Sequence, residues 1–302
     1  MNDITVIILT FNEEMHIERC INSVRNIANR VILIDSYSDD KTSLIAEKLG
    51  AEIFKRKWPG NQANQLNWAL ENISIKSKWI LRLDADEYLT DKLSNEINQK
   101  LSSMDENVSH IFLKRETFFL GSKVRFGGTT NIELLRMWKN GLAICEDRLM
   151  DEHMIALSGD GIIFNNLLID DSLRELHWWI SKHNDYSSRE VISILNERFN
   201  FYEEENLNDN FLGSQSEIKR SLKSIYSKFP LFVRPFLYFI YRYFLMLGFL
   251  GGYNGLIRHF LQAFWYRFLI DAKLFEIQMK CGNDKKKIAK YILDNWKINV
   301  EV

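Results

Sequence analysis

The chain has 302 residues, 46% hydrophobic and 26% charged, so it can bury a sizeable core in one large domain or two modest ones, which excludes a disordered chain. Its 39 basic and 40 acidic side chains nearly cancel, which argues against nucleic acid as the partner. Three widely spaced cysteines, Cys20, Cys145 and Cys281, exclude a CxxC metal site and fit reduced thiols in the cytosol.

The first 90 residues predict four strands that alternate with three helices. Apolar, mostly β-branched runs mark strands at 4–9, 31–35, 51–54 and 79–84, and helical spacing marks helices at 12–28, 39–50 and 61–73. Asn12 is available as the N-cap of the first helix. Because the first run lacks a basic region before it, it is interpreted as a strand and not as a signal peptide. The alternation predicts an α/β fold with an open parallel sheet.

Polar residues follow three of these strands: TFNEE after the first, DSYSDDKT after the second and DADE after the fourth. The carboxyl ends of parallel strands share one edge of a sheet, so these segments are expected to form one crevice. Neither a P-loop nor GxGxxG is present to hold phosphate. A divalent cation is the alternative, and Asp84 and Asp86 offer oxygen ligands that suit Mg²⁺ or Mn²⁺.

The segments VIILTFNEEMHIERCINSV, VILIDSYSDDKTSLIAEKLGA and WILRLDADEYL, in this order, resemble the nucleotide-sugar domain of inverting family 2 glycosyltransferases with the GT-A fold. This resemblance covers about residues 1–115. The DADE form and the QLNWAL segment before it are most similar to the bacterial branch that builds lipopolysaccharide core and exopolysaccharide repeat units.

The resemblance implies a role for each motif residue. Asp35 matches the residue that binds the nucleotide base, and Thr10 and Glu13 match residues that pack against the nucleoside. Asp84 matches the DxD position nearer the ribose, and Asp86 the position that binds Mn²⁺ or Mg²⁺ directly. For Glu13, favourable interaction with the dipole of the following helix is an alternative role.

Two departures from the family pattern concern the donor. Ser36 follows Asp35 where the family often has a second aspartate, and Gln62, Gln65 and Asn67 stand near the position of a common arginine. Contacts to the diphosphate are therefore not assigned from the sequence.

Inverting transfer needs a general base for the acceptor hydroxyl, and the acidic segment 145–159 is where the family places one. Glu152, seven residues before Gly159, fits best, with Asp151 as the close rival and the pair Glu146 and Asp147 as the remaining possibility. His153 is interpreted either as a metal ligand or as an orienting partner.

A helix is expected over residues 173–191, with His177, His183 and Tyr186 able to reach the crevice. Trp178 and Trp179 suit either the apolar face of a sugar or core packing.

The C-terminal third combines aromatic residues with arginines in segments 228–252 and 256–277. Its apolar runs are too short for a clean transmembrane helix. The pattern predicts helices in a membrane interface, with packing against the catalytic domain as the alternative, and the basic tail 285–290 would favour an anionic leaflet.

These observations predict a GT-A domain over residues 1–220, divided into a nucleotide-sugar half (1–115) and an acceptor half (116–220), and a helical membrane-associating region over 221–302. The predicted enzyme transfers sugar from a nucleotide-sugar donor, with UDP as the expected nucleotide, to a lipid-linked or lipopolysaccharide glycan at the cytoplasmic face of the membrane. The alternatives are a polyprenyl-phosphate glycosyltransferase and an inactive carbohydrate-binding subunit.

Overall fold

The computed structural model describes residues 3–130, 132–148, 150, 152–202, 226 and 229–300. The candidate base Asp151 and the predicted domain boundary between residues 220 and 221 lie outside the described residues.

The N-terminal half has the predicted alternation of strands and helices. Its elements are β1 Ile4–Thr10, α1 Ile17–Val24, β2 Arg30–Asp35, α2 Thr42–Lys48, β3 Glu52–Lys55, α3 Gln62–Asn72 and β4 Trp79–Asp84. Strands β3, β2, β1 and β4 are neighbours in that order, and every pair is parallel. The predicted α/β fold with a parallel sheet is confirmed.

The first helix starts later than the sequence predicts. Asn12 has a left-handed backbone conformation with φ of 56°, and α1 begins only at Ile17. The side chain of Asn12 accepts a hydrogen bond from the backbone N–H of Asp39 at 3.0 Å, and its own N–H donates to Ser38 Oγ at 2.9 Å. The prediction of Asn12 as an N-cap is therefore wrong, because this residue is bonded to the loop after β2 instead of to its own helix.

The second half extends the sheet on the β4 side. The further elements are β5 Glu87–Leu89, α4 Asp91–Lys100, β6 Val108–Phe119, β7 Ser122–Lys123, β8 Ile132–Lys139, β9 Ala143–Cys145, β10 Met154–Ala156 and β11 Asp160–Asp170. The sheet continues from β4 through β8, β6 and β11 to β5, with β7 paired to β6, while β9 and β10 form a separate two-stranded ribbon. Antiparallel β8 lies between β4 and β6. Buried clusters fill both faces of this sheet, one under α1 and α4 and the other under α3.

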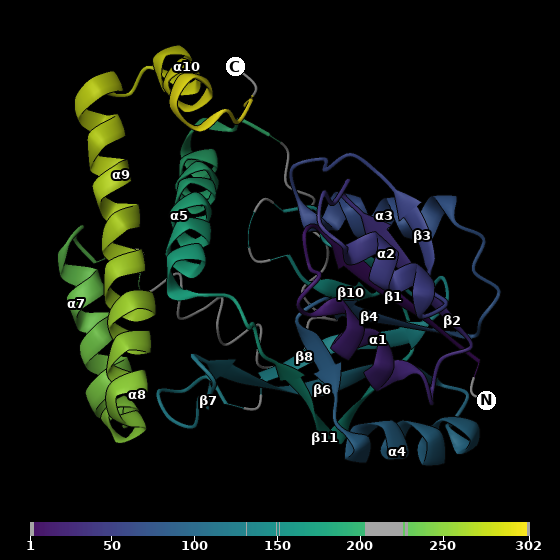
Figure 1. Ribbon diagram of the computed structural model, residues 1–302. Coiled ribbons are helices and arrows are strands. Elements are labelled where there is room, and N and C mark those ends of the chain that lie inside the picture. Colours follow the sequence, from purple (N-terminus) through teal and green to yellow (C-terminus); the bar gives the residue numbers. More distant parts are fainter. Residues whose placement is uncertain are drawn as a thin grey trace.

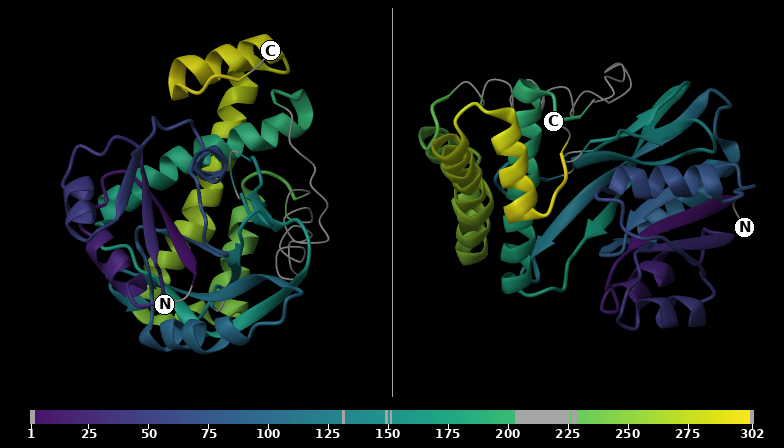
Figure 2. Two further views of the ribbon diagram at one scale, coloured as in Figure 1. Left: turned by 90° about the vertical axis from the view of Figure 1, so that its right-hand side faces the viewer. Right: turned by 90° about the horizontal axis from the view of Figure 1, so that it is seen from above.

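The C-terminal helices form a layer beside the sheet domain (Figures 1 and 2). They are α5 Leu176–Phe199, α7 Val233–Ile240, α8 Gly252–His259, α9 Tyr266–Cys281 and α10 Lys285–Trp296. Both figures place α5 between α9 and the sheet. Residues of α5, α9 and α10 share a third buried cluster that includes Val191, Ile270 and Ile292. Helix α5 thus joins the helical layer to the end of β11.

Residues 229–260, here called the apolar segment, contain α7, a π-helical stretch, a 3-10 turn and α8. The segment carries only three lysine, arginine, aspartate or glutamate side chains, Arg234, Arg242 and Arg258, and all three are buried. Arg234 pairs with the buried Asp271 of α9, and Arg242 donates to the backbone carbonyl of Gly127. The sequence interpretation of these arginines as interfacial side chains is wrong, because each guanidinium faces inward.

The outer surface of the apolar segment is therefore hydrophobic. It contains 15 of the exposed large hydrophobic side chains found among the described residues, for example Phe236, Phe244 and Leu245. In the part of the chain that the structure describes, no one helix has the length and hydropathy of a membrane span. The stretches Val233–Leu245 and Gly248–Cys281 reach these limits only together, with a bend of 70° between them.

Candidate active site

The predicted strand ends meet at one edge of the sheet. The register of β1 with its two neighbours places Thr10 beside Asp35 and Leu9 beside Asp84. Thr10 Oγ1 donates to Asp35 Oδ1 at 3.1 Å, and Ser38 donates its hydroxyl and its backbone N–H to the same carboxylate at 2.5 and 2.9 Å. Asp35 is fully buried, and these three bonds compensate its desolvation. The loop after β2 is thereby fixed against the end of β1.

Glu13 connects the loop after β1 to the segment before α5. Its carboxylate contacts His16 Nδ1 at 2.6 Å and Arg174 Nη2 at 3.4 Å. His16 Nε2 accepts a hydrogen bond from the backbone N–H of Leu173 at 2.8 Å, so its ring joins two distant parts of the chain. Glu13 consequently helps to hold α5 against the strand ends.

Asp84, at the end of β4, is paired with two buried arginines. Arg82 lies 3.3 Å from its Oδ1, and Arg136 of β8 lies 3.1 Å from its Oδ2. Arg136 also contacts the buried carboxylate of Glu87 at 2.5 Å, and Arg82 donates to Gln62 of α3 at 2.9 Å. Burial acts to raise the pKa of Asp84, but Arg136 and Arg82 hold that pKa well below its usual value. The first aspartate of the DADE motif is therefore ionised and rigidly oriented.

Asp86, the second aspartate, faces a cavity of about 200 Å³ and is in a different electrostatic environment. Burial, together with the carboxylates of Asp170, Asp84 and Glu87, raises the pKa of Asp86 to about 7, although Lys182 opposes the shift. This local excess of negative charge is the property that a bound cation would relieve.

The cavity lies between the sheet and the C-terminal helices. Besides Asp86, its lining includes Arg115 and Phe119 of β6, Asp170 of β11, Ser172 and Arg174 before α5, Trp178, Trp179, Lys182, His183 and Tyr186 of α5, and Arg258 and Gln262 of the C-terminal region. Burial acts to lower the pKa of Lys182, but Tyr186 and Asp86 outweigh it and hold the pKa above its usual value. Lys182 is therefore a cation close to Asp86.

The aromatic side chains of α5 line this cavity but are covered by other protein groups. Trp179 stacks on His183 with ring centroids 3.5 Å apart and packs edge to face on Phe119 at 5.8 Å. The guanidinium of Arg174 lies 4.5 Å, and the ammonium of Lys182 4.7 Å, from the ring centroid of Trp178. Packing is thus the observed role of Trp179, while Trp178 contacts cations. The expected His183 and Tyr186 reach the cavity, but the exposed His177 does not line it.

The segment that carries the candidate bases is the turn between β9 and β10. Asn67 of α3 exchanges two hydrogen bonds with the backbone of Cys145, at 2.7 and 2.9 Å. Asp147 accepts a hydrogen bond from Asn61 at 2.8 Å, and buried Glu146 pairs with Arg148 at 2.9 Å. Asp147 therefore attaches this turn to the start of α3, and Glu146 forms an ion pair within the turn.

Glu152 acts electrostatically on Cys145, which Arg82 contacts at 3.9 Å. Burial raises the pKa of the Cys145 thiol to about 11, with Arg82 opposing the rise and Glu152 adding to it. Neither Glu152 nor His153 lines the cavity that Asp86 faces. Their roles as base and metal ligand stay predictions.

Asp86 fits a cation that arrives with a phosphorylated ligand. Among the described residues, no group of three or more His, Cys, Asp or Glu side chains is arranged to hold a metal ion. Mg²⁺ in such enzymes is commonly bound by one or two carboxylates together with phosphate oxygens and water, and does not need a complete protein cage. Asp86, crowded by other carboxylates, has the donor chemistry for this role.

Sequence reasoning missed the cations of the site. Arg82 and Arg136 interrupt otherwise apolar strands, and a charge within a buried strand indicates a buried partner of opposite charge. Lys182 and Arg258 come from helices whose distance from Asp86 depends on the tertiary structure.

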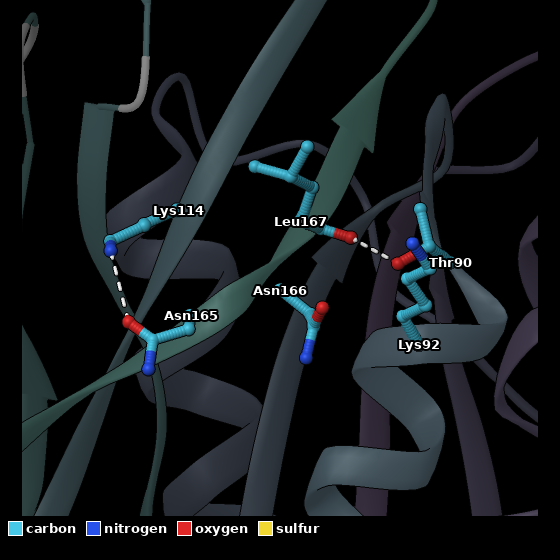
Figure 3. Close-up of a pocket in the computed structure, with 6 residues that line it drawn as sticks. All are labelled: Thr90, Lys92, Lys114, Asn165, Asn166 and Leu167. Carbon is cyan, nitrogen blue, oxygen red and sulfur yellow. Dashed lines mark hydrogen bonds between the residues drawn. The ribbon is translucent and has the colours of Figure 1, made fainter.

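A second cavity, of about 320 Å³, lies at the β6–β11 side of the sheet (Figure 3). It is lined by Thr90, Lys92, Lys114, Asn165, Asn166 and Leu167. Lys114 donates to Asn165 at 3.2 Å, and Thr90 donates to the carbonyl of Leu167 at 2.9 Å. The lining of this second cavity contains none of the strand-end residues described above.

Crystal structures of glucosyl-3-phosphoglycerate synthase from Mycobacterium tuberculosis resemble part of the fold. One such structure, in complex with Mn²⁺, UDP and glucosyl-3-phosphoglycerate, is 22% identical with a TM-score of 0.31 and covers 38% of this chain and 44% of that one. A second, with Mg²⁺ and UDP, has a TM-score of 0.30 at the same identity and covers 39% and 44% of the two chains.

Similarity to curated sequences extends over nearly the whole chain. A protein of Rickettsia bellii named as an uncharacterized glycosyltransferase is 30% identical over 285 residues, which cover 92% of this chain and 88% of the relative. A Rickettsia typhi protein with the same description is 29% identical and covers 94% and 90%. The family description "Glycosyl transferase family 2" matches residues 5–145, which contain β1 to β9 with both aspartates of the DADE motif. The chain is a glycosyltransferase and belongs to glycosyltransferase family 2.

Proposed function

We propose that this enzyme is a metal-dependent inverting glycosyltransferase that moves a hexose from a UDP-sugar to a lipid-linked glycan or to lipopolysaccharide core. The observation that carries the donor assignment is the contrast between the two strand-end aspartates. Asp84 is neutralised by Arg82 and Arg136, whereas Asp86 faces the cavity with carboxylate neighbours. A Mn²⁺ or Mg²⁺ ion bound through Asp86 would stabilise the charge that develops on the leaving diphosphate.

The protein side chains then have separate tasks. In this proposal Thr10, Glu13 and Asp35 form the nucleoside side of the site, and Asp84 orients the ribose. Glu152 takes the proton of the acceptor hydroxyl as that oxygen attacks the anomeric carbon, with Asp151 as the alternative base. The electrostatic effect of Glu152 on Cys145 supports this role, since Cys145 is contacted by Arg82 of the strand that carries Asp84.

The acceptor and the location are inferred from the apolar segment. Its exposed aromatic and aliphatic side chains, with the three arginines turned inward, fit a surface that lies in the headgroup layer of the cytoplasmic membrane face. A lipid-linked or lipopolysaccharide acceptor would be presented from that layer. Deletion of residues from 228 onward should release the remaining domain from anionic vesicles.

A polyprenyl-phosphate glycosyltransferase is the second candidate, because four cationic side chains line the cavity that Asp86 faces. In that reaction the lipid phosphate is the nucleophile and needs no strong base. Transfer that survives both Glu152→Gln and Asp151→Asn would favour this candidate.

The direct test is a hydrolysis screen of the purified full-length enzyme with UDP-, GDP- and dTDP-sugars in the presence of Mn²⁺. We expect hydrolysis of UDP-sugars, and its loss when a chelator is in excess. Preference for GDP- or dTDP-sugars would overturn the nucleotide assignment, and full activity in chelator would overturn the metal assignment.

A further inference from the structure

The cavity that Asp86 faces is also lined by residues of the C-terminal helices. Arg258, the next-to-last residue of α8, is buried and enters the cavity together with Gln262 one turn later. The guanidinium of Arg258 lies 5.4 Å from the ring centroid of Phe119. Within the described part of the chain, Arg258 forms no ion pair. Besides burial, the charged groups that affect its pKa most are Asp170, Arg242 and Arg115.

The cavity contains more positive than negative charge. Arg115, Arg174, Lys182 and Arg258 line it, against Asp86 and Asp170. Arg174 is paired with Glu13, and Arg115 lies 3.5 Å from Asp170. Burial lowers the pKa of Arg258 to about 10, with Asp170 opposing the shift and Arg242 and Arg115 adding to it. At neutral pH, Arg258 is thus a buried cation that forms no ion pair with any residue that the structure describes.

Several polar atoms in the lining of this cavity lack a hydrogen bond within the described part of the chain. They are Nε of Arg258 and Arg174, Oγ of Ser172 and Oε1 of Gln262. All four belong to residues that line this one cavity. Leaving a buried polar group unpaired costs about 1–3 kcal/mol, so such a concentration indicates a place where a polar ligand completes the bonding.

The position of Arg258 is fixed by contacts between the apolar segment and the sheet domain. Asn254 donates to Ser122 Oγ at 2.7 Å, and the backbone N–H of Gly127 donates to the carbonyl of Met246 at 2.9 Å. Gly127 has a φ of 87° and approaches the ring of His259 so closely that no side chain fits there. The same segment therefore offers apolar side chains outside and Arg258 inside.

We propose that Arg258, with Arg115, Ser172 and Gln262, forms a subsite for a phosphate-type anion on the acceptor. This inference rests on the proposed function, because the nucleotide is assigned to the strand ends, whereas Arg258 comes from α8 in the C-terminal region and is assigned to the acceptor. Phosphate oxygens would accept from the guanidinium N–H groups and the Ser172 hydroxyl, and the Gln262 amide can turn its NH₂ group toward them. The anion belongs either to a lipid phosphate or to a phosphorylated sugar of the acceptor glycan.

The test measures binding of phosphate probes to the full-length enzyme in detergent, with UDP and Mn²⁺ saturating so that the donor site is filled. The probes are farnesyl phosphate, farnesol and glucose 1-phosphate. The variants are Arg258→Gln, Arg258→Lys and, as the matched control, Arg25→Gln at an exposed arginine after α1. We expect Arg258→Gln to weaken binding of a phosphate probe about ten- to a hundredfold, Arg258→Lys to weaken it less, and Arg25→Gln to leave it unchanged.

Tighter binding of farnesyl phosphate than of both other probes would identify a lipid phosphate, and tighter binding of glucose 1-phosphate a phosphorylated sugar. The inference is overturned if no phosphate probe binds the UDP-loaded wild type, or if Arg258→Gln binds such probes as well as wild type does. Failure of the wild type to bind UDP with Mn²⁺ would instead contradict the proposed function. The two failures are therefore distinguishable.

Discussion

Removal of Arg136 should destabilise the site more than removal of a surface arginine with similar bonds. The Arg136 side chain is 6% exposed and contacts Asp84 at 3.1 Å and the 1% exposed Glu87 at 2.5 Å. In Arg136→Met, Asp84 would keep its ion pair with Arg82, whereas Glu87 would lose its ion pair with Arg136. Breaking a buried pair from one side costs about 3–5 kcal/mol, because the remaining charge stays desolvated.

Arg30 provides the matched control for this prediction. It forms two bonds with Glu52, at 2.8 and 2.6 Å, but Glu52 is 52% exposed, so Arg30→Met should cost less than about 1 kcal/mol. At about 2–4 °C per kcal/mol for a large domain, thermal unfolding of Arg136→Met should shift down by about 6–20 °C.

Circular dichroism of the purified variants measures this difference. Adding Glu87→Gln to Arg136→Met should recover part of the loss, since the substitution removes the buried charge that has lost its ion pair. Equal shifts for Arg136→Met and Arg30→Met would refute the argument that the buried arginine holds the two carboxylates together.

Three further predictions concern the base, the membrane and pH. Glu152→Gln should reduce transfer about 10²–10⁴-fold while UDP binding persists, and full activity of this variant would remove Glu152 from the mechanism. Leu245→Glu, at a 70% exposed position of the apolar segment, should weaken sedimentation with anionic vesicles about ten- to a hundredfold. The control Met279→Glu, at a 71% exposed position of α9, should not weaken it. Equal effects of the two substitutions would contradict a membrane-facing apolar segment. Burial, together with the charges of Arg242 and Arg258, lowers the pKa of His259 to about 4 in the folded protein. The pKa of an unfolded histidine is about 6.5, so the folded state binds fewer protons than the unfolded state between these two values. The free energy of unfolding should therefore fall as pH decreases from about 6.5 to about 4. Urea unfolding at pH 7 and 4.5 should show a weaker dependence for His259→Gln but not for the exposed His177→Gln, and parallel curves for all three proteins would contradict this assignment.

The N-terminal half could be predicted from the sequence because its signals are local. Short apolar runs mark the strands from β1 to β4, and the polar segments after β1, β2 and β4 come to one edge of the parallel sheet. The meeting of these segments at one edge therefore follows from strand direction, whereas the pairing of Thr10 with Asp35 depends on the register. The start of α1 could not be predicted, since Asn12 bonds to Ser38 and Asp39 across the loop instead of capping its own helix.

The rest of the site depends on contacts between residues distant in the sequence. Arg136 reaches Asp84 only because antiparallel β8 lies next to β4, and Lys182 and Arg258 approach Asp86 and Asp170 only when α5 and α8 are in place. The arginines of the apolar segment resemble interfacial side chains in the sequence, yet their partners, Asp271 and the Gly127 carbonyl, turn them inward. The periodicity of a helix does not reveal such partners.

The most direct test of the metal-bound donor is UDP-sugar hydrolysis by wild type and Asp86→Ala over a range of Mn²⁺ concentrations, with circular dichroism as the check of folding. The account predicts hydrolysis by wild type that rises with Mn²⁺ and stops in excess chelator, and no turnover by a folded Asp86→Ala. Full activity of Asp86→Ala, or of the wild type in excess chelator, would contradict the assignment of Asp86 as the residue that binds the metal.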